Sequence, residues 1–142
     1  RSGYSAENAI NLFLNAGVRA EKIVIGAAFY GKISELTTPT TDYNSVVGKP
    51  VLSTKTIRYT TIYEDYLTNP EYRECFDATC GASYLTNGKF FITYDNVDSI
   101  QRKVDLVKKY GLGGMMFWDY GSDTTGSLLK AVYNGIHALN EN

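Results

Sequence analysis

The amino-acid sequence predicts an α/β fold in which two buried parallel strands are separated by an inserted α+β subdomain. Two continuous apolar runs of strand length favour this fold: KIVIGAAFYGK (residues 22–32) and GGMMFWDY (residues 113–120). Strands that are apolar on both faces are typical of parallel sheets with covered faces. A helical pattern precedes each run, while residues 33–95 between the runs contain short strand patterns and turn signals.

Three helical segments accompany the two runs. The first is predicted to begin after Ser5, an N-cap whose hydroxyl accepts from free amides, and to end at Gly17. The second ends at Gly111, directly before the second strand, and the third is the amphipathic segment at residues 125–139. The apolar residues that share one face of these helices are Ala9, Ile10, Phe13 and Leu14; Ile100, Val104, Val107 and Tyr110; and Leu128, Leu129, Val132 and Ile136.

The inserted segment is predicted to start with a polar loop at residues 37–50, TTPTTDYNSVVGKP, which is rich in turn formers. A short helix follows in TIYEDYL. Three antiparallel strands are then expected in ECFDA, GASYLT and KFFITYD. The dipeptide Asn87-Gly88 joins the last two of these strands and is a strong hairpin signal, because both residues tolerate positive φ.

These patterns divide the chain into residues 1–32, an inserted subdomain at residues 33–95, and residues 96–142. Two buried parallel strands do not make a stable open sheet, because their apolar edges stay unpaired. We therefore expect the chain to be one slice of a larger barrel or sheet. The chain also begins with Arg1 rather than Met, and we expect it to be a piece of a longer protein, called the parent protein below.

Composition is typical of a globular domain, with 44% apolar and 20% charged residues among 142. The formal net charge is -1, so no field of one sign favours a nucleic acid or an anionic membrane as partner. No apolar run has the ~18 residues that a spanning helix needs. Exposed apolar edges lead us to expect self-association of the isolated chain.

The cysteines and the histidine predict no metal site. Cys75 and Cys80 are the two cysteines, His137 is distant in sequence, and three such residues cannot complete a four-ligand zinc site. We expect no cofactor. The spacing of the cysteines allows a local disulfide across a turn in an oxidising compartment, and equally two reduced thiols.

Trp118, the only tryptophan, stands at the end of the second predicted strand, just before the acidic and glycine-rich sequence DYGSD. Strand alternation places Met116 and Trp118 on one face, and Met115 and Phe117 on the other. In a (β/α)8 barrel the carboxyl ends of the strands carry the active site. An indole there offers a flat surface for the C–H face of a sugar, with the Tyr30 hydroxyl nearby; the alternative is plain packing in a core.

Four segments resemble family-18 glycoside hydrolases, the chitinase family. KIVIGAAFYGK is similar to the seventh barrel strand of that family. TIRYTTI and CFDATCGASYLTNGKFFITYDN resemble the small α+β insertion that its chitinases carry after this strand. YDNVDSIQRKVDLVKKYGLGGMMFWDYGSD resembles the stretch from the end of the insertion through the last strand, including the Gly-Gly-x-Met-x-Trp ending. The resemblance implies the C-terminal portion of a (β/α)8 TIM barrel with an α+β insertion subdomain.

The resemblance also implies roles for four residues. Trp118 matches the tryptophan beneath the sugar that is cleaved, and Met116 matches a methionine that lines the same pocket. Tyr59 aligns with a tyrosine of the insertion that faces bound sugar, and Tyr30 matches the tyrosine that closes the seventh strand. Lys32 stands where the family usually has arginine, which replaces a planar fork of donors with a point charge.

The catalytic signature of the family, D-x-x-D-x-D-x-E, does not occur in the sequence, so no catalytic residue is expected in this chain. Asp95 to Asp98, DNVD, imitates its beginning, but we interpret this segment as the start of a helix, where carboxylates complement the dipole. Asp119 and Asp123 are interpreted as loop and cap residues. The implied reaction is substrate-assisted, retaining hydrolysis, in which the 2-acetamido group of the sugar is the nucleophile.

The leading interpretation is a fragment of a chitinase-like hydrolase of β-1,4-linked N-acetylglucosamine polymers. The parent protein is then an enzyme, secreted or at the cell surface, whereas this chain alone is inactive. Two alternatives stay open: a non-catalytic chitin-binding lectin with the same barrel, and a family-18 enzyme that acts on cell-wall, spore or N-linked glycans. The expected partner in the leading case is chitin or an N-acetylglucosamine oligosaccharide.

Overall fold

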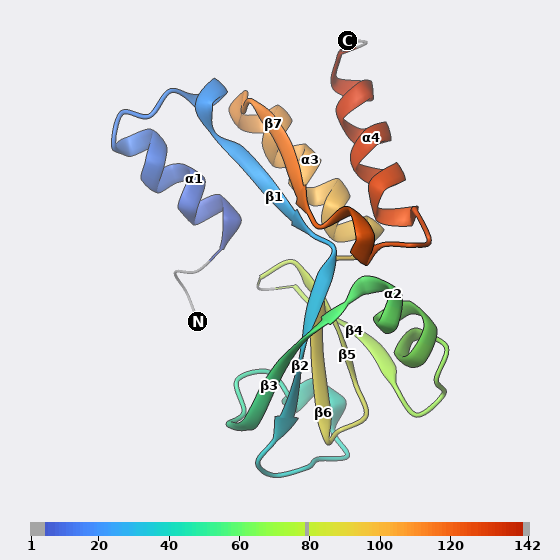
Figure 1. The fold of residues 1–142 in the computed structure, drawn as a ribbon. Coiled ribbons are helices and arrows are strands. Elements are labelled where there is room, and N and C mark those ends of the chain that lie inside the picture. The colour runs from blue at the N-terminus through green and yellow to red at the C-terminus, as the bar shows by residue number, and fades with distance from the viewer. Residues whose placement is uncertain (1–4, 79, 141–142) are drawn as a thin grey trace.

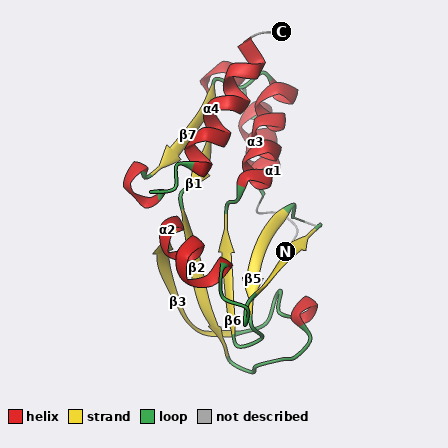
Figure 2. Ribbon diagram, turned by 90° about the vertical axis from the view of Figure 1, so that its right-hand side faces the viewer, coloured by secondary structure: helices red, strands yellow, loops and turns green. Residues whose placement is uncertain are grey.

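A computed structural model describes residues 5–78 and 80–140 of the chain. It is a mixed α/β structure with two sheets (Figures 1 and 2). The smaller sheet is the parallel pair of β1 and β7, and the larger is antiparallel with strand order β3-β2-β6-β5-β4. The strands are β1 (Val24–Ala28), β2 (Tyr30–Leu36), β3 (Val51–Arg58), β4 (Arg73–Asp77), β5 (Ala82–Thr86), β6 (Phe90–Tyr94) and β7 (Gly114–Trp118).

Within the described residues, four α-helices accompany the sheets: α1 (Ala6–Asn15), α2 (Tyr59–Thr61), α3 (Val97–Tyr110) and α4 (Ser127–Asn140). A π-helix, Ile62–Leu67, continues α2, and short 3-10 turns lie at Ala20–Lys22, Tyr43–Ser45 and Tyr120–Ser122. α3 and α4 pack against each other and against the parallel pair, while α2 lies on the larger sheet (Figure 1). The two sheets therefore form the two ends of an elongated molecule.

The predicted ends of the helices agree with the structure. The Ser5 hydroxyl accepts from the amide of Asn8 and caps α1. Asn96 and Ser99 form a capping box at the start of α3, which confirms that the DNVD segment begins a helix. Gly111 ends α3 with φ of 61°, a left-handed conformation that glycine adopts without steric cost.

The first apolar run is not one strand, contrary to the prediction. β1 pairs with β7 only as far as Ala28, and β2 starts the antiparallel sheet at Tyr30. Phe29 lies between them, donating from its amide to the Trp118 carbonyl at 2.8 Å and accepting from the Tyr59 amide at 3.0 Å. Antiparallel pairing therefore begins at Tyr30, before the predicted subdomain boundary at residue 33. The sequence did not predict this, because an apolar run does not reveal that its pairing partner changes midway.

The inserted segment differs from the prediction in two further places. β3 was not predicted, because most of its side chains are exposed and its sequence lacks an apolar alternation. The hairpin between β5 and β6 is present, but Gly88 alone adopts positive φ, at 82°. The Asn87 side chain instead accepts from the amides of Lys89 and Phe90, which makes an Asx-type turn.

One core joins the two sheets. Its buried members are Ala27, Phe29, Tyr59, Ile62, Leu85, Ile92, Tyr94, Ile100, Leu128 and Val132. The Phe29 and Phe117 rings stack with centroids 4.9 Å apart, and Phe29 is the residue at which the chain passes from one sheet to the other. At Gly31 a Cβ atom would lie 2.5 Å from both Ile62 Cδ1 and the Thr93 carbonyl oxygen. The close packing of β2 against its neighbours therefore requires glycine at this position.

Candidate functional site

Trp118 ends β7 with its indole turned outward. Met116 and Trp118 are 48% and 65% exposed, while Met115 and Phe117 pack into the cores. The predicted alternation of faces along this strand is therefore confirmed. Trp118 does not fill a core within the described residues, because most of its surface is exposed there.

A pocket of about 410 Å³ opens beside Trp118, between the end of the parallel pair and the first strands of the larger sheet. Its lining residues are Tyr30, Lys32, Thr56, Ile57, Arg58, Trp118, Asp119 and Ser122. Of the four expected site residues, Tyr30 and Trp118 line this pocket. Met116 shares the exposed face of Trp118 but lies outside the lining.

Tyr59 does not face the pocket. It is 5% exposed, and its ring lies in the shared core, 6.4 Å from the Tyr94 ring. Burial raises the pKa of its hydroxyl. The expectation that Tyr59 faces sugar is therefore not supported by its position here, because the residue begins α2 and the turn into this helix directs its ring inward.

Arg58 is a pocket residue that the sequence analysis missed. It is the direct cross-strand partner of Tyr30, as Thr56 is of Lys32. Residues opposite each other on paired strands present their side chains on the same face. Had β3 been predicted, its alternation would have placed Thr56 and Arg58 beside the two expected residues of β2.

The pocket combines an aromatic floor with polar walls. Lys32 and Arg58 supply cationic donors, and neither forms an ion pair with another residue in the described part of the chain. Asp119 supplies the carboxylate in the lining, and the peptide bond that joins it to Trp118 is cis. One carboxylate is not the pair that a two-carboxylate glycosidase uses.

Asp123 has a structural role, as expected. It is 7% exposed and accepts from the amides of Leu128 and Leu129 at 2.9 and 3.2 Å, which caps α4. The Thr125 hydroxyl donates to its other oxygen at 2.6 Å. Asp119 precedes a short 3-10 turn but makes no side-chain cap hydrogen bond, so a capping role for its side chain is wrong.

The end of β1 is fixed by the carboxylate of Asp95. It accepts from the Ala28 amide at 2.8 Å, from the Ser99 hydroxyl at 2.9 Å and from the Lys103 ammonium at 2.5 Å. Lys103 also donates to the Gly26 carbonyl at 2.9 Å. Since Ala28 pairs with Trp118 in register, these bonds from the start of α3 hold the strand end that carries the pocket.

The described residues contain no group of three or more His, Cys, Asp and Glu side chains that could hold a metal ion. Cys75 and Cys80 are free thiols, which favours the reduced alternative for this pair. His137 packs on the ring of Tyr133 at 4.0 Å between centroids. Across residues 5–78 and 80–140, no helix is both long and apolar enough to cross a membrane.

The chain is similar in sequence to known chitinases. Chitinase 63 of Streptomyces plicatus is 30% identical over 96% of the chain and 22% of its own length. The class V chitinase CHIT5a of Medicago truncatula is 30% identical over 94% of the chain and 35% of its own length. The chain thus spans about a fifth to a third of these relatives.

Solved structures of the same fold match as well. A family-18 N-acetylglucosaminidase from Paenibacillus barengoltzii has 38% identity and a TM-score of 0.83, over 93% of the chain and 39% of that protein. A family-18 chitinase from Cycas revoluta, in complex with (GlcNAc)4, has 28% identity and a TM-score of 0.84, over 95% of the chain and 39% of that protein. The profile described as Glycosyl hydrolases family 18 matches residues 1–123. The chain therefore belongs to family 18 of the glycosyl hydrolases.

Proposed function

We propose that the chain is the C-terminal portion of a (β/α)8 barrel in a chitin-degrading hydrolase, and that the larger sheet is a subdomain inserted between two barrel segments. The parallel pair with α3 and α4 packed against it has the arrangement of neighbouring barrel units. The antiparallel sheet lies between β1 and α3 in the chain. The fit to solved family-18 structures over more than nine-tenths of the chain supports this assignment.

The observation that carries the proposal is the exposed indole of Trp118 at the carboxyl end of a parallel strand, in a pocket with hydrogen-bonding walls. A pyranose ring has an apolar C–H face, which stacks on an indole, and a rim of hydroxyl and acetamido groups. Tyr30, Thr56 and Arg58 offer donors and acceptors around that rim. We infer that the pocket binds one N-acetylglucosamine unit of a chitin chain.

The reaction that fits this pocket is substrate-assisted hydrolysis of the β-1,4 bond. The acetamido carbonyl oxygen attacks the anomeric carbon while a general acid protonates the departing glycosidic oxygen, which gives a cyclic oxazolinium ion. Water, deprotonated by the same group, then opens this ion with retention of configuration. The glutamic acid for these steps belongs to the motif that the sequence lacks, and we assign it to another part of the parent protein.

In this mechanism the residues of the chain bind and orient the substrate. Trp118 supports the ring that distorts, and Lys32 and Arg58 fix its polar groups, so that the acetamido oxygen lies in line with the anomeric carbon. Without the general acid, which contributes typically 10² to 10⁴ in rate, the chain alone is inactive. We also propose that the parent protein is secreted or at the cell surface. A similar chitinase from Paenibacillus, 33% identical over 94% of the chain, is described as cell-surface-expressed.

Assays of the parent protein on (GlcNAc)4 and on the matching tetramer of glucosamine test the proposed function. We expect hydrolysis of the acetylated tetramer, with the β-anomer as first product by proton NMR, and none of the amine, because the amine lacks the attacking carbonyl. Equal hydrolysis of both tetramers, or an α-anomer as first product, contradicts the mechanism. Binding of (GlcNAc)4 without hydrolysis moves the parent protein to the lectin alternative.

A further inference from the structure

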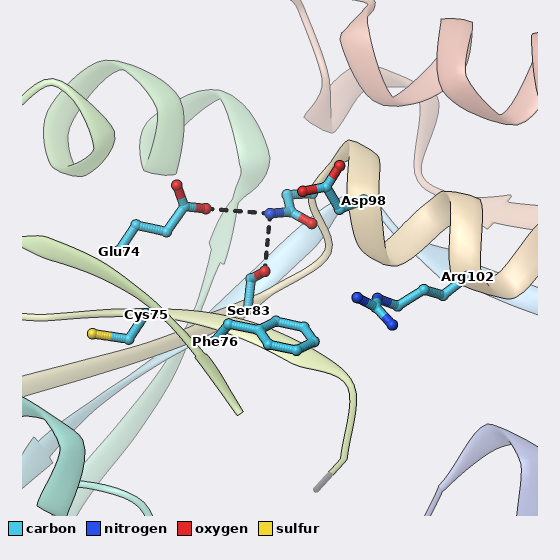
Figure 3. A pocket seen from close by; sticks show the side chains of 7 residues that line it. Glu74, Cys75, Phe76, Ser83, Asp98 and Arg102 are labelled. Atoms are coloured by element: carbon cyan, nitrogen blue, oxygen red, sulfur yellow. Dashed lines mark hydrogen bonds between the residues drawn. The ribbon is translucent and has the colours of Figure 1, made fainter. Parts of the chain in front are cut away.

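A second pocket, of about 290 Å³, lies where β4 and β5 meet the start of α3 (Figure 3). Its lining residues are Glu74, Cys75, Phe76, Ser83, Asn96, Asp98 and Arg102, none of which lines the Trp118 pocket. Through the strand register, Glu74 shares a face of the larger sheet with Leu85 and Ile92, whereas Lys32 lies opposite Thr93 on the other face. The two pockets therefore use opposite faces of one sheet.

The floor of the second pocket is fixed by hydrogen bonds between four elements. The Asn96 amide nitrogen donates to Ser83 Oγ at 2.9 Å and to Glu74 Oε1 at 3.2 Å, as Figure 3 shows. The Tyr94 hydroxyl donates to the same Glu74 oxygen. Asn96 is itself fixed, because its side-chain oxygen accepts from the Ser99 amide in the capping box. These polar groups are thus held in place before any ligand arrives.

The wall of this pocket keeps its hydrogen-bonding capacity free. Asp98 and Arg102 have the i, i+4 spacing at which ion pairs form on a helix, yet Arg102 extends away from Asp98 and toward Phe76 (Figure 3). Its guanidinium carbon lies 4.7 Å from the centre of the Phe76 ring. Within the described residues, the Arg102 guanidinium has neither an ion pair nor a hydrogen bond. Its five donors are therefore not used by other described residues.

We propose that this pocket is a second carbohydrate site, which holds a single N-acetylhexosamine unit of a chitin chain outside the cleft. Within a β-1,4-linked chain such a unit keeps its C3 hydroxyl beside the 2-acetamido group. The acetamido carbonyl can accept from the Arg102 guanidinium, and the acetamido N–H and the C3 hydroxyl can donate to the carboxylates of Glu74 and Asp98. Phe76 is 47% exposed and offers ring surface to the C–H face of the sugar. The volume is near the lower end of the roughly 300–1,000 Å³ range of small-ligand pockets, which suits one ring rather than a longer chain.

The identity of the sugar at this second site rests on the proposed function. The role that we infer for the site is to hold the polymer close to the cleft. A polymer held at one point on the enzyme stays at high effective concentration near the cleft, even when each contact is weak. The site therefore anchors insoluble chitin, whose chains are long enough to reach both faces of the inserted sheet, and has little effect on short soluble oligosaccharides.

The test uses N-acetylglucosamine itself, which has no glycosidic bond to cleave, and the ¹⁵N-labelled parent protein carrying Trp118→Ala to weaken the cleft. The Nε–H signal of Arg102 is identified as the one that disappears in Arg102→Gln. We expect this signal to shift on titration with the sugar. Arg102→Gln is expected to weaken binding in this background about tenfold or more, the effect of losing a charged hydrogen-bond donor. Glucose, which lacks the acetamido group, is expected to bind more weakly.

Arg73→Gln is the matched control, because Arg73 lies on β4, is exposed and does not line the pocket. Equal affinity in Arg102→Gln and Arg73→Gln, an unshifted Arg102 signal, or equal binding of glucose overturns the second site. On β-chitin powder, Arg102→Gln is expected to lower the bound fraction while hydrolysis of (GlcNAc)4 is unchanged. If Arg102→Gln hydrolyses (GlcNAc)4 normally and binds the powder like the wild type, the second site is refuted and the proposed function stands. If the wild-type parent protein does not bind chitin, the proposed function is refuted as well.

Discussion

Replacement of Trp118 by alanine is the most direct perturbation of the proposed cleft. The indole is 65% exposed in the chain, so among the described residues its removal leaves no cavity and exposes no core. We expect the free energy of unfolding to change by no more than about 0.5 kcal/mol, as for ordinary surface substitutions. A loss of activity then reports binding rather than folding.

The size of that loss follows from the area that a sugar covers. A tryptophan side chain offers about 250 Å², so roughly 160 Å² is exposed here, and a ring stacked on one face covers about half of this area. At ~25 cal/mol per Å², burial of ~80 Å² is worth about 2 kcal/mol, or about 30-fold in affinity. If the indole holds the distorted ring more tightly than the relaxed one, part of the loss appears in kcat rather than in KM.

The assay is kcat/KM of the parent protein on (GlcNAc)4, with Tyr120→Ala as control. Tyr120 is also a highly exposed aromatic residue, 72% accessible, two positions along the chain, and it does not line the pocket. We expect a loss of about 30-fold for Trp118→Ala and less than about threefold for the control, by the same area estimate. Equal losses in both variants, or less than threefold for Trp118→Ala, refute the assignment of the indole as the sugar platform.

Three further predictions concern stability and assembly. Asp95→Ala is expected to lower the free energy of unfolding by about 3 kcal/mol in urea titrations, because it leaves the Lys103 ammonium and a strand amide without their partner. Lys109→Met, which breaks the exposed pair with Glu7, is expected to cost far less than Asp95→Ala, because solvent screens an exposed pair; equal costs would contradict this reasoning. Burial raises the pKa of the Tyr84 hydroxyl to about 12. The ordinary pKa of a tyrosine is about 10, so between about pH 10 and 12 the folded state keeps a proton that the unfolded state loses. Stability is therefore expected to fall from about pH 10 to 12, by up to ~1.4 kcal/mol per pH unit for this group, and Tyr84→Phe is expected to flatten the slope in urea titrations; an unchanged slope would exclude the group. The isolated 142-residue chain is expected to self-associate in light scattering and to leave a chromogenic chitobiose substrate intact, whereas a cooperatively unfolding monomer, or turnover that survives repurification, would contradict these two expectations.

The helices, the second parallel strand and the outward face of Trp118 could be predicted because each depends on local chemistry. Ser5 and Gly111 mark helix ends through the orphan amides and carbonyls that every helix has. The alternation along β7 follows from the geometry of any strand. For these elements the tertiary structure only confirms what a few consecutive residues already require.

The pocket itself was only half predictable, because part of its lining lies on a strand that the sequence does not indicate. Arg58 and Thr56 lie on β3, whose exposed and largely polar residues carry no strand signal, and they reach the site only through the register with β2. Tyr59 is buried in the shared core, whereas its neighbour Arg58 lines the pocket. A sequence alignment does not reveal which of two neighbouring side chains turns inward at the start of α2.

The division of one apolar run between two sheets also explains how the site keeps its shape. The chain crosses between the sheets at Phe29, and a flexible crossing would let the floor at Trp118 move against the wall at Tyr30. The backbone of Phe29 is instead bonded on one side to Trp118 and on the other to Tyr59. The adjoining amide, that of Ala28, is held by a carboxylate from the start of α3. The bonds come from β7, α2 and the segment before α3, so the crossing is held by three different parts of the chain. In the proposed function, this fixes the wall at Tyr30 against the floor at Trp118 and so orients the bound sugar.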